Sequence, residues 1–422
     1  MLRLKASIDK YLPYIKNTGL YFFSSLFVAL IGILLNPIFA MNLSHEDYAI
    51  LGYYQSFNLL LVPLLHFCLF SYYSRNYYFT PEDKRDELGD TVLLSSIVIG
   101  FFSLTIFTSI FYFTHKLSKS SFPFAPYAIL TFLQLYISNI TSFYLIKLRI
   151  TRKAKTYAKL SVFQSLLITA FSLLLVVYFK LGAEGKLLGT LIVTIIVALY
   201  SLKKSIIHLR INSKILKQGL KFCFPLTISA ILWYFLTGVD RAFLAQYDDP
   251  INYGLYSIGL QIAGYLTIFY TTVSNTFEPD IYQSIAQKKK KKLVFVISTI
   301  IGTVIFFNLI FILFAPFIIK LLTAGRYIDA APYAQILSLH NISMACYYMT
   351  VKLLIGYGFV KTELLVRIIG AASSVLCFYF LIKGWGFMGA AWGQVLSFSL
   401  LTVIGLIAFC FCRKSKTYHP EI

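Results

Sequence analysis

Charged residues are scarce in this 422-residue chain, at 13% of the sequence, and acidic residues are scarcer still, with 17 Asp and Glu. So few polar groups cannot cover the surface of a soluble globular protein. The 38 Lys and Arg nevertheless leave a net charge of +21. In a chain that is 58% hydrophobic, this excess predicts basic loops at the anionic cytoplasmic face of a membrane, and no nucleic-acid partner is expected.

Several kinds of chemistry lack the residues they need. The six cysteines show no CxxC spacing and lie in or beside apolar stretches, which argues against disulfides and zinc. There is no GxxxxGK[ST] loop, so the chain is not built to hydrolyse ATP. No connection between apolar segments exceeds about 17 residues, which is too short for a catalytic domain. The sequence therefore predicts no enzyme, no metal and no cofactor.

Long apolar runs fill about 300 positions and predict an all-α polytopic membrane protein with twelve spanning helices. The expected spans are 17–40, 48–73, 88–114, 122–146, 157–179, 184–202, 220–246, 252–276, 293–321, 331–356, 362–382 and 388–411. Lys and Arg number 26 in the connections on one side of these spans and 5 on the other. Because basic loops stay in the cytoplasm, both termini are expected there, which agrees with an even number of spans.

The two halves of the chain match each other at a nearly constant offset. Tyr48–Leu51 corresponds to Tyr253–Tyr256, 205 positions later. Lys155-Thr156 corresponds to Lys361-Thr362 at an offset of 206. Three glycines recur at an offset of 204, namely Gly182, Gly185 and Gly189 at Gly386, Gly389 and Gly393. These matches predict a duplicated unit with two pseudo-symmetric six-helix lobes, residues 1–210 and 211–422. Two such lobes related by an axis along the membrane normal are a layout of secondary transporters.

Charged side chains inside a span are costly unless they are paired or wet, so each is a functional candidate. Asp240 and Arg241 are adjacent in span 220–246, and Arg367 lies in span 362–382. Arg241 and Arg367 could bind an anionic ligand, while Asp240 could hold Arg241 or carry a coupling proton. A self-neutralising pair that anchors helices is the alternative for Asp240 and Arg241. Lys352 is a further candidate for substrate contact, although a lysine this near a span end can also reach the interface.

Polar residues share one face of the expected span 252–276. The face follows three- and four-residue spacing through Gln261, Tyr265, Ile268, Thr272 and Asn275. Such a stripe faces either packed protein or a wet cavity, and Gln261 and Asn275 are the candidates for substrate contact. Near the outer end of the first span, Asn36 adds an amide beside Pro37, a helix breaker.

The C-terminal half contains a series of short motifs: DRAFL at 240–244, YGLYS at 253–257, FEPDIY at 277–282, GRY at 325–327, AAPY at 330–333 and ILSL at 336–339. These motifs resemble segments of the Wzx-type O-antigen flippases of the polysaccharide transporter family. The length, the twelve expected spans and the duplicated lobes are similar to this family over essentially the whole chain. The family belongs to the superfamily that also contains the MATE multidrug exporters.

The resemblance implies a flippase in the bacterial inner membrane. It would move undecaprenyl-diphosphate-linked sugar repeat units from the cytoplasmic to the periplasmic leaflet by alternating access, with the first, second, seventh and eighth helices lining the cavity. The lipid-linked substrate and membrane lipids are the implied partners, together with a polysaccharide polymerase and a chain-length regulator. Arg241 and Arg367 become candidates for phosphate contact. Ion gradients drive family members, which makes Asp240 and Glu278 candidates for ion coupling.

The main alternative is a MATE-type ion-coupled exporter of small molecules. Such exporters typically carry acidic residues inside the N-terminal lobe, and spans 17–40, 48–73, 122–146 and 157–179 contain none. Peptidoglycan-precursor flippases are a second relative, but they usually have fourteen spans and arginines in the first helix. A membrane polymerase or ligase is disfavoured because the expected outer connections are short.

Overall fold

The computed structural model describes residues 2–117 and 121–415. It describes their side chains apart from residues 2–19 and positions 22, 268, 269, 272, 275, 276, 279, 360 and 415. All secondary structure in this part of the chain is helical. The chain forms two compact units, one made of Met1–Leu43 with Asn58–Ile228 and the other of Ser44–Phe57 with Ser229–Ile422. These units are defined by packing, whereas the lobes 1–210 and 211–422 were defined by the sequence repeat. The two lobes therefore stay a prediction.

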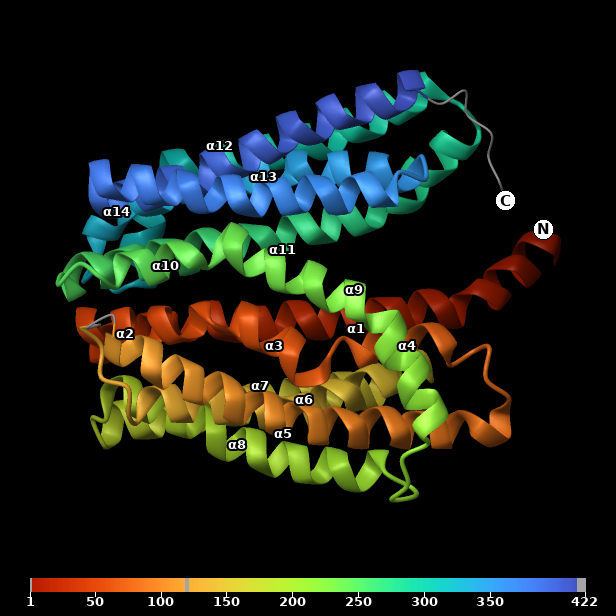
Figure 1. Cartoon of the computed structure of the whole chain (residues 1–422), viewed down its shortest axis with the longest axis horizontal. Helices are drawn as coiled ribbons and strands as arrows, with labels where there is room; N and C mark the ends of the chain where they lie inside the picture. Colours follow the sequence, from red (N-terminus) through yellow and green to blue (C-terminus); the bar gives the residue numbers. More distant parts are fainter. Residues whose placement is uncertain (1, 118–120, 416–422) are drawn as a thin grey trace. The chain divides into compact units, whose positions relative to one another are not determined.

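The first unit is a bundle of long helices (Figure 1). Its elements are α1 (Leu2–Asn42), α3 (Asn58–His66), α4 (Leu69–Asn76), the 3-10 turn η1 (Glu82–Lys84), α5 (Arg85–Leu117), α6 (Tyr127–Ile150), α7 (Ala154–Leu173), the π-helical turn η2 (Leu174–Tyr178), α8 (Gly182–Ser205) and the first part of α9 (Ser213–Thr237). Helix α6 packs against α8, α7 against α1 and α8, and α5 against α3 and α6.

The second unit contains the rest of α9 and all later helices, together with one earlier segment. Its elements are α2 (His45–Ser56), α10 (Val239–Leu244), α11 (Pro250–Ala286), α12 (Lys290–Leu322), the 3-10 turn η3 (Ile328–Ala330), α13 (Ala331–Gly356) and α14 (Val360–Ser415). Helix α13 is the central element, since α11, α12 and α14 all pack on it. Fourteen of its residues are buried.

The chain is a multi-pass membrane protein. Nine helices in the described residues are long and apolar enough to cross a membrane. The last of them lies in α14 and contains two expected spans, 362–382 and 388–411. Gly386, between these two spans, interrupts the helix with non-helical backbone angles. Helices α11 and α13, which match the expected spans 252–276 and 331–356, are not among the nine. The count of twelve and the cytoplasmic termini therefore stay predictions.

Two expected helix boundaries differ from the structure. Helix α1 begins at Leu2 instead of residue 17 and continues through Pro37 to Asn42. The sequence predicted a helix break at Pro37, but the helix continues through it. A proline removes only one amide donor, and the neighbouring backbone groups can stay paired. The expected span 220–246 is interrupted at Gly238, between α9 and α10.

The expected span 48–73 is divided into α2, α3 and α4. Phe67 and Cys68 have positive φ angles of 45° and 50°, which separate α3 from α4. His66 Nδ1 accepts a hydrogen bond from the Cys68 amide at 3.0 Å. The Cys223 thiol of α9 donates to the Cys68 carbonyl at 3.2 Å. Side chains thus replace backbone partners that the helix loses at the break.

The repeated glycines have the same backbone role in both halves. Gly182 and Gly386 have positive φ angles of 52° and 54°, a conformation that glycine adopts without strain. About two helical turns later, Gly189 lies against the Ser172 backbone, and Gly393 lies against the Phe378 ring. Ser172 and Phe378 are 206 positions apart, close to the offset of the sequence repeat. The two glycine pairs therefore recur at nearly the same offset, and the duplication stays a prediction.

Helices α2 and α11 cross at a point where their backbones nearly touch. A Cβ atom added to Gly52 would meet the Ser257 hydroxyl, and one added to Gly254 would meet the backbone carbonyl of His45. Small residues at a crossing let helices approach closely inside a membrane. The close approach explains why α2 belongs to the second unit although it precedes most of the first in sequence.

The segment between α8 and α9 is held by the N-terminal part of α5. Asp90 is almost fully buried, and its carboxylate accepts hydrogen bonds from the amides of Ile207 and His208 at 3.1 and 2.7 Å. Asn212 donates its side-chain amide to Glu87 at 2.7 Å. The longest expected inner connection is therefore fixed to the first unit.

Candidate functional site

A cavity of about 280 Å³ with mostly apolar walls lies inside the second unit, between α9, α11 and α13. Its walls combine apolar side chains with three threonines, a histidine, an amide and two aromatic rings. The lining residues are Trp233, Thr237, Leu260, Ala263, Gly264, Thr267, Thr271, Leu337, His340, Asn341, Met344 and Tyr348. Apolar walls with a few fixed polar groups are typical of sites for small ligands.

Helix α13 supplies the main hydrogen-bonding groups of this cavity. The Asn341 side-chain amide donates to the Ala263 carbonyl of α11 at 3.0 Å, and its oxygen accepts from the Thr267 hydroxyl at 3.3 Å. His340 Nδ1 lies 3.3 Å from the Gln394 carbonyl of α14. These bonds satisfy polar groups that burial would otherwise penalise, and they fix how α13 faces α11.

Aromatic rings form another part of the wall. The ring centroids of Trp233 and Tyr348 lie 5.7 Å apart with an interplanar angle of 37°. Behind them, Tyr270 of α11 lies 5.9 Å from Tyr348. Aromatic side chains offer flat apolar faces with polar edges. Beside an amide and several hydroxyls, they can bind a ligand that presents both C–H and O–H groups.

Lys352 and Glu278, two of the residues selected from the sequence, lie together in the structure. The Lys352 ammonium is 3.1 Å from the Glu278 carboxylate and donates to the Ser274 hydroxyl at 2.8 Å. The lysine side chain is 12% exposed and the glutamate side chain 38%. The pair joins α13 to α11, and its carboxylate is the more accessible member.

Arg367 forms a second polar cluster between α14 and α9. Its guanidinium pairs with Glu363 one turn earlier and donates to the Ser229 hydroxyl at 2.7 Å. Its Nε is buried and has no hydrogen-bond partner within the described part of the chain. The cation is therefore neutralised by one carboxylate but keeps an unused donor.

Asp240 and Arg241 are embedded in a third cluster, on α10. Asp240 is fully buried, and one carboxylate oxygen accepts from the Tyr256 hydroxyl at 2.5 Å. Arg241 donates to the Thr237 carbonyl at 2.6 Å, and its Nε is 3.6 Å from the other Asp240 oxygen. The Tyr253 hydroxyl donates to the Arg241 carbonyl at 3.1 Å. This network ties α10 to α11.

The remaining candidates lie apart from the cavity lining. Gln261 donates to the Tyr265 hydroxyl at 3.1 Å, along the predicted stripe. The residues of α11 that line the cavity follow the neighbouring face, roughly 100° around the helix from that stripe. Asn36 is buried in α1 of the first unit. The Asn275 side chain lies outside the described residues.

Sequence reasoning missed the contribution of α13. It selected Lys352 there but not His340, Asn341 or Tyr348, which line the cavity, and it missed Trp233 and Glu363. The signal that could have found them is the adjacent pair His340 and Asn341 in the middle of the expected span 331–356. Polar side chains at that depth need a structural or functional reason. No group of three or more His, Cys, Asp or Glu in the described residues could hold a metal ion.

The fold of the chain matches the folds of known membrane transporters. Its fold matches a lipid II flippase, MurJ, in an inward closed conformation, with a TM-score of 0.68 and 17% identity over 94% of this chain and 87% of that one. It also matches an inward-facing multidrug transporter of the MATE family, with a TM-score of 0.64 and 14% identity over 94% and 96%. The proteins that share this fold are thus transporters and not enzymes.

Sequence comparison is more specific than the fold. A protein of the Lsg locus of Haemophilus influenzae is 25% identical over 285 residues, which cover 65% of this chain and 67% of that protein. The profile of the family described as "Polysaccharide biosynthesis protein" matches residues 14–279, more than half of the chain. The protein therefore belongs to the polysaccharide biosynthesis protein family.

Proposed function

We propose that the protein flips undecaprenyl-diphosphate-linked oligosaccharide repeat units of the O-antigen type across the bacterial inner membrane. The substrate enters from the cytoplasmic leaflet and leaves in the periplasmic leaflet by alternating access. The membership of the polysaccharide biosynthesis family and the fold shared with a lipid II flippase support this direction. A diphosphate with several sugars cannot cross hydrocarbon without a polar path.

The observation that carries the proposal is the cavity of the second unit. A sugar presents hydroxyl groups at its rim and C–H groups on its faces. The Asn341 amide and the Thr267 and Thr271 hydroxyls match the first kind of group, and the Trp233 and Tyr348 rings match the second. The volume of about 280 Å³ suits one part of an oligosaccharide and not the whole repeat unit.

The cations supply the proposed contacts to phosphate or acidic sugars. Arg241, Arg367 and Lys352 each have a carboxylate partner, so a diphosphate would have to replace that partner. The exchange is easiest at Lys352, because its partner Glu278 is the most exposed of the three carboxylates. Gln261, Asn275 and Asn36 stay in the proposal as polar contacts of the substrate path.

The proposal assigns the coupling of transport to an ion gradient to two of these ion pairs, Lys352–Glu278 and Arg241–Asp240. Protonation of Glu278 would neutralise the carboxylate and release the Lys352 ammonium for an anionic substrate. Asp240 is proposed as a second coupling group, acting through Arg241. A polysaccharide polymerase and a chain-length regulator are proposed partners, to be tested by co-purification from membranes.

Complementation tests the proposal directly. The gene is expressed in a strain that lacks its own O-antigen flippase but makes the cognate lipid-linked unit, and surface polysaccharide is scored by gel ladder. We expect a restored ladder with the natural chain, a weaker one with Trp233→Ala in the cavity, and a normal one with Trp385→Ala, whose side chain is 64% exposed.

A multidrug exporter is the second candidate, because a MATE transporter shares the fold with a TM-score of 0.64. The two functions separate in one experiment on the same strains. No ladder despite correct membrane insertion, together with energised efflux of a cationic dye, would replace the flippase proposal by the exporter.

A further inference from the structure

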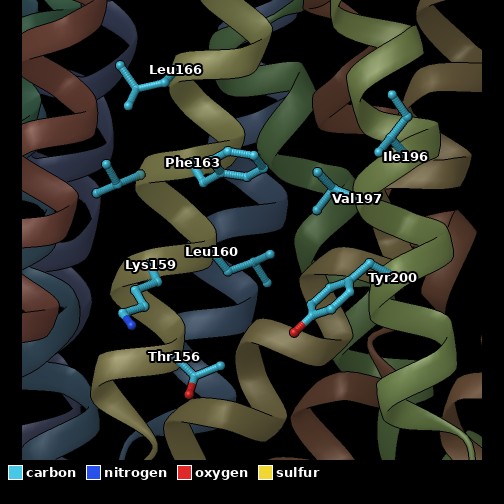
Figure 2. Close-up of a pocket in the computed structure, with 9 residues that line it drawn as sticks. Thr156, Lys159, Leu160, Phe163, Leu166, Ile196, Val197 and Tyr200 are labelled. Atoms are coloured by element: carbon cyan, nitrogen blue, oxygen red, sulfur yellow. The ribbon is translucent and has the colours of Figure 1, made fainter.

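A groove lies in the first unit, between α7 and α8, far along the chain from the cavity of the second unit. Its volume is about 700 Å³ (Figure 2). Phe163 and Leu166 of α7 and Ile196 of α8 form its walls, and their side chains are 58%, 47% and 51% exposed. The groove is thus open along its length to the surroundings of the helix pair, which in a membrane are lipid.

Polar and apolar groups are separated along this groove. Figure 2 shows the hydroxyls of Thr156 and Tyr200 and the ammonium of Lys159 at one end, with Phe163, Leu166 and Ile196 beyond them. An amphiphilic groove of this kind matches a ligand that has a polar head and an apolar tail. A simple packing defect between two helices would have no reason to place its polar atoms together.

The polar end of the groove carries the positive charge of Lys159. Lys159 is exposed, and no ion pair or hydrogen bond engages it within the described residues. The groove lining contains no carboxylate. Lys153 and Lys155 lie at the start of α7, and Lys203 and Lys204 at the end of α8, so both helices bring cations to the same end. The head group that fits is therefore an anion.

The length of the groove identifies the tail. Thr156 and Leu166 are ten residues apart on α7, which is about 15 Å along a helix. The hydrocarbon core of a bilayer is about 30 Å thick, so the groove spans one leaflet. An ordinary acyl chain fills one leaflet, whereas an undecaprenyl chain is much longer. The basic end of both helices is the cytoplasmic one by the distribution of Lys and Arg.

We propose that this groove binds an anionic phospholipid of the cytoplasmic leaflet. One acyl chain lies along Phe163, Leu166 and Ile196, and the phosphate lies at Lys159 with the hydroxyls of Thr156 and Tyr200. The site is separate from the proposed substrate path in the second unit, so its existence does not depend on the identity of the transported substrate.

Native mass spectrometry of the full-length, delipidated protein tests the proposal. The protein is titrated with phosphatidylglycerol or phosphatidylcholine of the same acyl chains, and the first binding event is compared. One lysine near an anionic surface contributes enough to change affinity about fivefold. We therefore expect the natural chain to prefer phosphatidylglycerol about fivefold, and Lys159→Ala to remove this preference.

Two further variants keep the test specific. Lys204→Ala removes an exposed cation at the same end of α8 but outside the groove lining, and it should keep the preference. Ile196→Trp fills the groove from an exposed position and should weaken both lipids. Equal losses in Lys159→Ala and Lys204→Ala, or no preference in the natural chain, would overturn the site. Displacement of phosphatidylglycerol by a lower concentration of undecaprenyl phosphate would assign the groove to the carrier lipid instead.

Discussion

The close approach of α2 and α11 can be tested with two glycines of α11, Gly254 and Gly264. A methyl group at Gly254 would lie against the His45 carbonyl and within 2.9–3.0 Å of its carbonyl carbon and Cα. All three atoms are backbone, so no side chain can rotate away and α2 must move. At Gly264, also in α11, nothing lies within 4 Å of the added methyl.

The two substitutions to alanine differ only in this contact. Each gains about 1 kcal/mol of helix propensity, and overpacking at Gly254 costs about 1–3 kcal/mol. The variants should therefore differ by about 1–3 kcal/mol, with Gly254→Ala the less stable. At about 2–4 °C per kcal/mol for a unit of this size, the midpoints of thermal unfolding should differ by roughly 2–12 °C.

The measurement is the loss of the monodisperse peak of the purified full-length protein in size-exclusion chromatography, after heating at one fixed rate. Gly264→Ala should be as stable as the natural chain or slightly more stable. If Gly254→Ala and Gly264→Ala share one midpoint, the backbones at the crossing do not touch, and the argument for the close approach of α2 to α11 is wrong.

Three other substitutions give further predictions. Asp90→Ala leaves the amides of Ile207 and His208 without a charged acceptor and should lower the free energy of unfolding by about 3 kcal/mol. The same chromatography should therefore show a lower midpoint; an unchanged midpoint would show that other contacts hold the segment between α8 and α9. Arg241→Ala should reduce surface polysaccharide in complementation while Lys290→Ala should not, and equal activity would remove Arg241 from the proposed path. Glu278→Gln keeps an acceptor near Lys352 but no titratable group, so flipping should lose its response to an uncoupler; a normal response would exclude Glu278 from coupling.

The helical membrane fold was predictable because it depends on hydrophobicity alone. The boundaries of expected spans such as 122–146 and 184–202 lie two to five residues from those of single helices, α6 and α8. The breaks were not predictable, because they depend on tertiary partners. Cys68 adopts a positive φ without being a glycine, and its backbone is completed by His66 and Cys223, which are distant from each other in sequence.

The candidate site was predictable only in part, for a related physical reason. Charge in a membrane span is conspicuous in a sequence, so Lys352 and Glu278 could be selected, but their pairing could not. Neutral groups such as Trp233 and Tyr348 are common in membrane helices. Only the packing of α9 against α13 shows that these two rings lie together on a cavity wall.

The contact between Gly52 and Ser257 has a consequence for how the chain evolved. These residues are 205 positions apart, which is the offset that relates Tyr48–Leu51 to Tyr253–Tyr256. Each residue therefore touches its own counterpart, as happens where a local dyad passes through an isologous interface. If the two halves arose from a homodimer, as the predicted duplication implies, one mutation there would have changed both partners at once before the two copies were fused. After fusion, one counterpart could become serine while the other stayed glycine.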